Sequence, residues 1–429
     1  MYLEWGFKGC LFETEALKPD NMGNELLVGR DEEIRSFHTR LRASNKIITF
    51  DGNNGVGKTS LINIGLYRSY CDFLEAPDSN PLFIPCRTVF QLEDAHDLKH
   101  FRFKVLLEIA QTLIEKKREL ASLEKNLQGS HKINAWLNDS LVRDWSATII
   151  QFSVGRNTSV NDSTGFNESG FEKAITTWLS DTFSSVKGGV VCVLDNLELL
   201  QTSKIARQCL ESLRDTVFQI KGIRWALCGA NNIILSFANS PRLNGFLESP
   251  IEIKPLSGIF ITDIYSSREK SYRSKNLTYL PLTTKEFELL YMVLNNNLRT
   301  TLSKCHDYCI SIFEKNLKPS TADEKKTFFE NWLQKEAKHN EQACVSQVKT
   351  RSFAIFDFAA KELNGSFSPS QHELFNCANP QLLRPYVKEL EDAGLLISQI
   401  DEDDNRRKTI SITPKGWLVN YSRIISGRA

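Results

Sequence analysis

The residues with the most distinctive chemistry in this sequence stand at 52–59. They read Gly-Asn-Asn-Gly-Val-Gly-Lys-Thr, which matches the phosphate-binding pattern G-x-x-x-x-G-K-[ST] in full. Glycines allow the backbone to wrap closely, so that its N–H groups face phosphate oxygens. In this pattern the lysine, Lys58, reaches the outer phosphates, and the hydroxyl of Thr59 holds Mg²⁺.

The flanking residues supply the elements that such a loop needs. Ile47 to Phe50 form an apolar run that fits a buried strand, and the residues after Thr59 have the apolar spacing of a helix. The N-terminus of that helix adds the positive end of its dipole to the loop. A chance glycine-rich turn is the alternative, and the strand and helix argue against it. The expected phosphate contacts are Gly52, Asn53, Asn54, Gly55, Val56, Gly57, Lys58, Thr59 and Ser60.

A second motif, GGVVCVLDNLE, stands at 188–198. Val190 to Leu194 form a continuous apolar run, as expected for a strand that is buried on both faces. Asp195 follows at the carboxyl end of that strand, where open parallel sheets place their ligands, and we expect it to position Mg²⁺. Glu198 stands where it can orient or deprotonate the attacking water. On its own this pattern often marks only a strand end, but with the loop at 52–59 it indicates a nucleotide site.

A further short strand is predicted at Arg224 to Cys228, followed by Gly229-Ala230-Asn231-Asn232. A polar side chain at this strand end can contact the attacking water or the outermost phosphate. Asn231 is the first candidate for that contact and Asn232 the second. A plain turn rich in Gly and Asn is the alternative.

Composition excludes several classes of protein. The chain has 429 residues, 41% hydrophobic and 24% charged, so it is long enough for two or three domains with ordinary globular content. Its formal net charge of +1 excludes a polybasic nucleic-acid binder, so any such binding needs a local patch. Ten cysteines without a C-x-x-C pair indicate reduced thiols in a cytoplasmic protein, and Cys305, His306 and Cys309 lack a second ligand cluster for zinc. We expect neither a signal peptide nor a membrane span.

The segment LLVGRDEEIRSFHTRL, Leu26 to Leu41, resembles the one that precedes the phosphate loop in initiator-type AAA+ ATPases and in the related STAND switch ATPases. The resemblance implies that Val28, Gly29 and Arg30 line the pocket for the base. An amphipathic helix beginning near Asp31 is the simpler interpretation. The resemblance extends to about Cys305 and leaves the choice between the two branches open.

Two arginines acquire roles from the same resemblance. Arg242, in SPRLNGFLESPIEIKPLS, matches the position from which AAA+ proteins insert an arginine finger into a neighbouring subunit, although a surface arginine in a loop is an equal alternative. Arg299, in LNNNLRTTLSKC, matches the lid arginine that reaches the γ-phosphate in cis. Asn296 replaces the family glycine there and Asn297 stands at an Asp/Asn position; asparagine tolerates the left-handed backbone that glycine usually supplies.

The C-terminal residues from about 349 predict three helices and two strands in the order of a winged helix-turn-helix, similar to MarR-type regulators. Initiator ATPases also carry such a domain. The resemblance places the third helix in the major groove and the wing on the phosphates. The candidate DNA contacts are Gln381, Arg384, Lys388, Arg406, Arg407 and Lys408.

Charge gives a counter-signal in this module. Asp401 to Asp404 stand directly before the wing arginines, and from residue 345 eleven Lys and Arg stand against ten Asp and Glu. Phosphate binding needs local positive charge, so a winged helix that binds protein stays an alternative.

The sequence therefore predicts an α/β fold, with the parallel sheet of a P-loop NTPase, a helical lid and a C-terminal winged helix-turn-helix. The expected domains are 1–255 (a nucleotide-binding core with an insertion at about 90–187), 256–345 (lid and connector) and 346–429 (winged helix). The expected function is a slow, oligomer- or partner-stimulated ATPase that binds ATP and Mg²⁺ and acts as a switch on DNA or a DNA-bound complex. The alternative is an ATP-gated assembly, for example in bacterial antiviral defence, whose winged helix binds a partner effector. A metabolic P-loop kinase fits the second motif, the lid arginine and the winged helix poorly.

Overall fold

The computed structural model describes residues 1–92, 98–117, 128–139, 168–184, 187–197, 203–230, 234, 237, 240–401 and 407–428. These residues divide into two compact units. The sheet unit comprises residues 32–51 and 62–251, and the lid unit comprises 1–31, 52–61 and 252–429. Within the described ranges, no helix is both long and apolar enough to cross a membrane.

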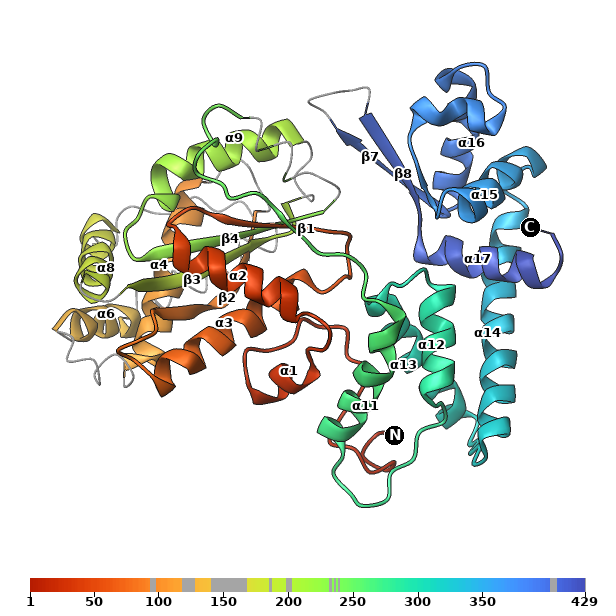
Figure 1. The fold of residues 1–429 in the computed structure, drawn as a ribbon, viewed down its shortest axis with the longest axis horizontal. Helices are drawn as coiled ribbons and strands as arrows, with labels where there is room; N and C mark the ends of the chain where they lie inside the picture. The colour runs from red at the N-terminus through yellow and green to blue at the C-terminus, as the bar shows by residue number, and fades with distance from the viewer. Residues whose placement is uncertain are drawn as a thin grey trace. The chain divides into compact units, whose positions relative to one another are not determined.

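A five-stranded sheet forms the centre of the sheet unit (Figure 1). Its strand order is β2-β3-β4-β1-β5, and β1 to β4 are parallel. The predicted α/β class is therefore confirmed, as are the strands that the apolar runs predicted. The strands are β1 (Ile48–Asp51), β2 (Leu82–Gln91), β3 (Gly188–Asp195), β4 (Ile223–Gly229) and β5 (Ile251–Glu252).

The register of the sheet brings the carboxyl ends of its central strands to one edge. Asp51, the last residue of β1, lies opposite Gly229 of β4, and Leu194 of β3 lies opposite Leu227. β3 is buried from Gly189 to Asp195, because it is covered on both faces as its continuous apolar run predicts. This edge is where parallel sheets of this kind bind their ligands.

Helices cover the sheet and complete its core. α4 packs on β2, and α6 and α8 lie side by side and contact α4 (Figure 1). The large aromatic side chains Phe103, Phe171 and Trp225 are buried in this core. The helices are α2 (Asp31–Ala43), α3 (Lys58–Glu75), α4 (Leu98–Glu115), α6 (Gln128–Asn138), α8 (Glu168–Phe183), α9 (Ser203–Leu213) and the π-helix η3 (Arg214–Phe218).

The lid unit contains a second core, which includes the start of the chain. Tyr2, Phe7 and Phe12 are buried among side chains of the lid helices, such as Phe287 and Tyr308. The expected division had placed residues 1–255 together, whereas contacts group residues 1–31 with the residues after 251. The elements here are α1 (Asn21–Leu26), η4 (Gly258–Phe260), α11 (Ile261–Tyr272), α12 (Thr284–Val293), α13 (Leu298–Glu314) and α14 (Ala322–Val345).

A third core lies in the C-terminal residues, whose elements follow the predicted order. β7 and β8 pair antiparallel, and a short strand that the sequence did not indicate, β6, pairs with β8. The second helix is a 3₁₀ helix that Ser368 caps at its N-terminus. Gln371 departs from helical dihedrals within it, and Asn376 ends the segment in a left-handed conformation. The elements are α15 (Thr350–Glu362), β6 (Ser366–Phe367), η5 (Pro369–Phe375), α16 (Pro380–Asp392), β7 (Leu396–Asp401), β8 (Arg407–Ile412) and α17 (Pro414–Ile425).

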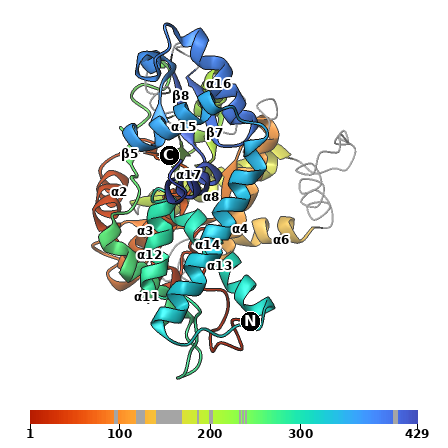
Figure 2. The same cartoon turned by 90° about the vertical axis from the view of Figure 1, so that its right-hand side faces the viewer.

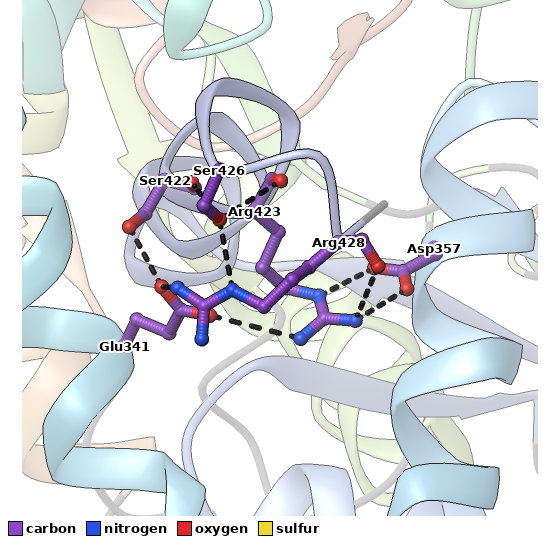
Figure 3. Close-up of polar contacts among 6 residues, drawn as sticks. All are labelled: Glu341, Asp357, Ser422, Arg423, Ser426 and Arg428. Atoms are coloured by element: carbon purple, nitrogen blue, oxygen red, sulfur yellow. Dashed lines mark hydrogen bonds and ion pairs between the residues drawn. The ribbon is translucent and has the colours of Figure 1, made fainter.

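A buried cluster of charges joins α14, α15 and α17 (Figure 3). The carboxylate of Glu341, only 1% exposed, accepts hydrogen bonds from Ser422 Oγ at 2.7 Å and Arg428 Nη2 at 2.9 Å. Arg423 lies 3.6 Å from the same carboxylate and donates to both carboxylate oxygens of Asp357, at 2.8 and 2.7 Å. Its hydrogen bonds to Asp357 raise the pKa of Arg423, so the guanidinium stays charged. The cluster fixes α17 to the long connector helix α14, which Figure 2 shows in full.

We expect Glu341→Gln to lower the free energy of unfolding by about 3 kcal/mol, because removing one partner of a buried charge network leaves the others uncompensated. Urea unfolding followed by tryptophan fluorescence measures the change. Glu336→Gln is the matched control, since Glu336 lies on the same helix and pairs with Lys304 nearer the surface, where about 1 kcal/mol or less is expected. Equal effects of the two substitutions would contradict a special role for the cluster.

Candidate functional site

The glycine-rich loop at 52–57 connects β1 to α3, as predicted. Gly55 has φ +84°, a backbone conformation that side chains disfavour. Gly52 approaches the backbone of Ile253 so closely that a Cβ atom there would collide with the Ile253 carbonyl. The sequence therefore needs glycine at these two positions for different reasons, one for conformation and one for space.

Lys58 lies over its own loop. Its Nζ donates hydrogen bonds to the carbonyls of Gly52, at 2.7 Å, and Asn53, at 3.2 Å, and the residue is only 7% exposed. Thr59 and Ser60 follow in the first turn of α3. The ammonium group thus lies at the loop and at the start of the helix. An anion bound there is stabilised by the ammonium charge and by the positive end of the helix dipole.

Arg30 is hydrogen-bonded to the loop. It is 4% exposed, and its Nη2 donates to the carbonyl of Val56 and to that of Lys254, each at 2.9 Å. The resemblance implied a place in a base pocket for Gly29 and Arg30; the structure shows the guanidinium engaged with backbone carbonyls, and the ring of Phe260 packed where a side chain at Gly29 would stand. Contact with a base stays a prediction for both residues. What the geometry shows is that Arg30 supports the loop.

The lid motif also contacts the loop. Asn296 has φ +62°, so the prediction that it replaces glycine in a left-handed conformation is confirmed. Asn297 caps α13, and Arg299, in the first turn of that helix, is exposed. The Asn297 amide also donates to the carbonyl of Asn54, at 3.4 Å. Sequence reasoning missed this loop contact, because nothing local to residue 297 indicates a partner 243 positions away.

In the sheet unit, Asp195 ends β3 as predicted and is 7% exposed. Its Oδ1 accepts a hydrogen bond from the backbone N–H of Asn196, at 2.8 Å. A buried carboxylate at this edge is a suitable ligand for Mg²⁺ or its water shell. The other predicted residues of this edge, Glu198, Asn231 and Asn232, lie outside the described residues.

Arg242 lies in an exposed loop of the sheet unit, with a side chain that is 55% exposed. It pairs with Asp215 at 2.8 Å and Glu211 at 3.8 Å, at the junction of α9 and the π-helix η3. Arg214 donates to its backbone carbonyl, which holds the loop in place. The position is compatible with either interpretation of Arg242, and the finger stays a prediction.

The candidate DNA contacts on α16 share one exposed surface. Gln381, Arg384 and Lys388 are all exposed, while Leu383 and Val387 of the same helix face the core. Arg407 and Lys408 belong to β8, opposite Asp401 and Ile400 of β7, and their side chains are not described. Arg406 lies outside the described residues. Leu374 and Leu382, 46% and 53% exposed, lie in η5 and in the first turn of α16.

Two more contacts concern residues that the sequence analysis discussed or missed. The backbone N–H of Leu17 donates to Ser60 Oγ at 3.0 Å, which ties the N-terminal segment to the start of α3; no sequence signal indicates it.

His306 accepts or donates a hydrogen bond with Tyr2 at 3.0 Å and lies 3.5 Å from the Cys10 sulfur. Among the described residues, no group of three or more His, Cys, Asp or Glu side chains is arranged to hold a metal ion.

The chain is similar to solved structures only at low sequence identity. No protein-family model and no curated protein matches the sequence. Among solved structures, the chain is similar to the Aeropyrum pernix ORC2 protein in ADPNP–ADP complexes, with 11% identity, 98% of each chain covered and a TM-score of 0.46. It is also similar to the Aeropyrum pernix ORC1 protein in complex with DNA (13% identity, 95% of this chain and 98% of the other, TM-score 0.42). A third is Cdc6p from Pyrobaculum aerophilum (13% identity, 97% of each chain, TM-score 0.41).

These proteins are of the initiator type that the sequence motifs resemble. All three TM-scores lie below 0.5, so the likeness does not define the chemistry of this chain. That chemistry has to be argued from the loop, the lid and the acid at the strand end.

Proposed function

We propose that this chain is an ATP-binding and hydrolysing ATPase of the AAA+ type that acts as a nucleotide-dependent switch on DNA or a DNA-bound complex. The observation that carries the proposal is the loop at 52–59. Its residues match the phosphate-binding pattern in full, and its backbone is held in shape by Lys58 and Arg30. A loop of this composition at the start of an 18-residue helix binds the phosphates of a nucleotide.

Magnesium and hydrolysis are assigned to residues of the two motifs. Thr59 and Asp195 have the oxygen donors that Mg²⁺ prefers and would hold it; when bound, the ion neutralises charge on the phosphates. Glu198 would orient or deprotonate the attacking water, with Asn231 as its polar neighbour at the next strand end. Lys58 would exchange its carbonyl contacts for the outer phosphates.

Two arginines would complete the site. Arg299, on the lid helix α13, would contact the γ-phosphate in cis, and Arg242 would do so from a neighbouring subunit of a homo-oligomer. Before it reached another subunit, Arg242 would have to leave Asp215 and Glu211. Because the Arg242 side chain is 55% exposed, each pair contributes about 0–1 kcal/mol, and assembly can break them readily.

We favour DNA as the target of the switch, contacted by the C-terminal module as a winged helix. Gln381, Arg384 and Lys388 occupy one exposed helix surface, which suits insertion into a groove. Arg406, Arg407 and Lys408 would bind phosphates.

A second candidate function is supported by a different observation. Leu374 and Leu382 are about half exposed beside the same helix surface, and exposed apolar side chains favour a protein partner over a phosphate backbone. In that case the chain would be an ATP-gated assembly that controls a partner effector.

Lys58→Ala tests the nucleotide site. We expect ATP affinity to fall at least 10- to 100-fold, because charge-assisted hydrogen bonds to the phosphates are lost. Isothermal titration calorimetry measures the change, and Lys46→Ala, at an exposed lysine just before β1, is the control that should bind ATP normally. ATP binding at wild-type affinity by Lys58→Ala would show that the site assignment is wrong.

Glu198→Gln tests hydrolysis separately from binding. The substituted side chain keeps its shape but loses its basicity, so we expect ATP to bind with unchanged affinity while turnover falls about 10²- to 10⁴-fold. Phosphate release under single-turnover conditions measures this. Full turnover by the variant would remove Glu198 from the catalytic role.

An Arg406/Arg407/Lys408 triple-alanine variant distinguishes DNA binding from binding of a protein partner. If these residues bind phosphates, DNA affinity falls and the slope of log K against log salt becomes shallower by up to about 3. Fluorescence anisotropy across a salt series, with and without ATP, measures both quantities. The matched control replaces three exposed lysines of α14, Lys326, Lys335 and Lys338, and should leave the slope unchanged. Absence of DNA binding by the wild-type chain in every nucleotide state would favour the protein-binding switch.

A further inference from the structure

The lid helix α13 begins directly against the phosphate loop. A Cβ atom built at Gly55 would lie 2.9 Å from Asn297 Oδ1 and 3.2 Å from Arg299 Cβ. No side chain therefore separates the loop backbone from the first turn of the helix. The backbone of Arg299 therefore lies directly beside the loop.

Asn297 uses both ends of its amide at this contact. Its Oδ1 accepts a hydrogen bond from the backbone N–H of Thr300, at 3.0 Å, which caps the helix. With the oxygen used by the cap, the amide nitrogen is left to donate to the loop, to the Asn54 carbonyl at 3.4 Å. The same side chain thus fixes the start of α13 and ties it to the loop.

The turn before the helix keeps Asn297 in place from behind. Asn295 and Asn296 both have positive φ angles, +49° and +62°, which reverse the chain between α12 and α13. Leu294 and Leu302, on either side of this turn, are 1% and 3% exposed in the lid core. The N-terminus of α13 is therefore anchored in a packed core and carries one amide that extends to the loop.

We propose that Asn297 is a positioning residue that holds Arg299 in line with the phosphate loop, so that the site distinguishes a nucleoside triphosphate from a diphosphate. The proposal rests on the function proposed above. Arg299 is exposed and has a long side chain, so its guanidinium can serve the third phosphate only if its backbone is kept at the correct distance. Without the amide tie, the helix would still fold and stay packed on the lid core, but its first turn would lose its direct hydrogen bond to the loop.

Asn297→Ser separates the tie from the cap. Serine is a good cap for a helix N-terminus and is uncharged, but it is too short to reach the Asn54 carbonyl as well. We expect the ratio of ATP to ADP affinity to fall about fivefold, the effect of one hydrogen bond, with the thermal midpoint nearly unchanged. Calorimetric titration with a non-hydrolysable ATP analogue and with ADP measures the ratio.

Asn379→Ser is the matched control. Asn379 caps α16 in the same way, accepting from the N–H of Leu382 at 3.0 Å, but has no part in the phosphate loop. Its replacement by serine should change the thermal midpoint as little as Asn297→Ser does and should leave the nucleotide ratio unchanged. A merely structural role of Asn297 would give the two variants the same nucleotide ratio.

A double variant tests whether Asn297 acts through Arg299. Arg299→Ala alone should lower the ratio about tenfold or more, since a charged hydrogen bond to the third phosphate is lost. Adding Asn297→Ser to it should then change the ratio less than twofold, because the positioned group is gone.

Three results would overturn the inference. They are an unchanged ratio in Asn297→Ser, an unchanged ratio in Arg299→Ala, and losses that multiply in the double variant. With ATP still bound and Lys58→Ala still defective, each would leave the proposed function standing. If the wild-type chain binds neither nucleotide, the proposed function fails and the inference fails with it.

Discussion

A phosphate loop has to turn its N–H groups outward, and its carbonyl oxygens then need donors from the protein. In this chain four of those carbonyls receive hydrogen bonds from three side chains. Lys58 donates to those of Gly52 and Asn53, Asn297 to that of Asn54, and Arg30 to that of Val56. In a planar trans peptide unit the C=O and the N–H point in opposite directions. A carbonyl held by a side chain on one side of the loop therefore directs the N–H of the following residue to the other side. The rest of the site depends on this arrangement.

The donors come from well-separated parts of the sequence, so the loop is a junction of the lid unit. Arg30 also donates to the carbonyl of Lys254. Two residues further on, the carbonyl of Leu256 accepts a hydrogen bond from the hydroxyl of Tyr291. Burial raises the pKa of Tyr291 to about 12, so this hydroxyl keeps its proton and its role as donor near neutral pH. The segment after β5 is therefore connected by hydrogen bonds to the loop through Arg30 and to α12 through Tyr291.

Features that depend on neighbouring residues can be predicted from this sequence, whereas features that depend on distant contacts cannot. The loop, the strand that ends at Asp195 and the left-handed Asn296 are predictable, because the signal for each lies in a few neighbouring residues. These signals are a complete motif, a continuous apolar run, and an asparagine where the resemblance implies a glycine. The burial of Tyr2 and Phe7 in the lid core was not, since it depends on packing against residues more than 250 positions away. The role of Arg30 lies between these cases. The motif identifies Arg30 as a candidate site residue, but only the fold shows that its guanidinium donates to backbone carbonyls.

Glu341 shows a signal that was present in the sequence but was not used. The buried positions of α14 recur three or four residues apart: Phe329, Leu333, Ala337, Glu341 and Cys344. A carboxylate in such an apolar stripe predicts a buried partner, because an isolated buried charge is too costly to keep. Which arginine supplies the partner could not be predicted, since Arg423 is equally suited to the surface.

The packing of α17 gives the lid unit a further property. Leu418 is buried in the core of the lid, whereas the next residue, Val419, is buried in the C-terminal core. One helix therefore belongs to two cores, and Arg423, further along it, is fixed to α14 and α15 through Glu341 and Asp357. Packed cores deform little, so a movement of α13 at the loop has to be accommodated by the core that it shares with α17. The core that contains the first turns of α13 and the core that contains the buried face of α16 are thus joined by a single helix.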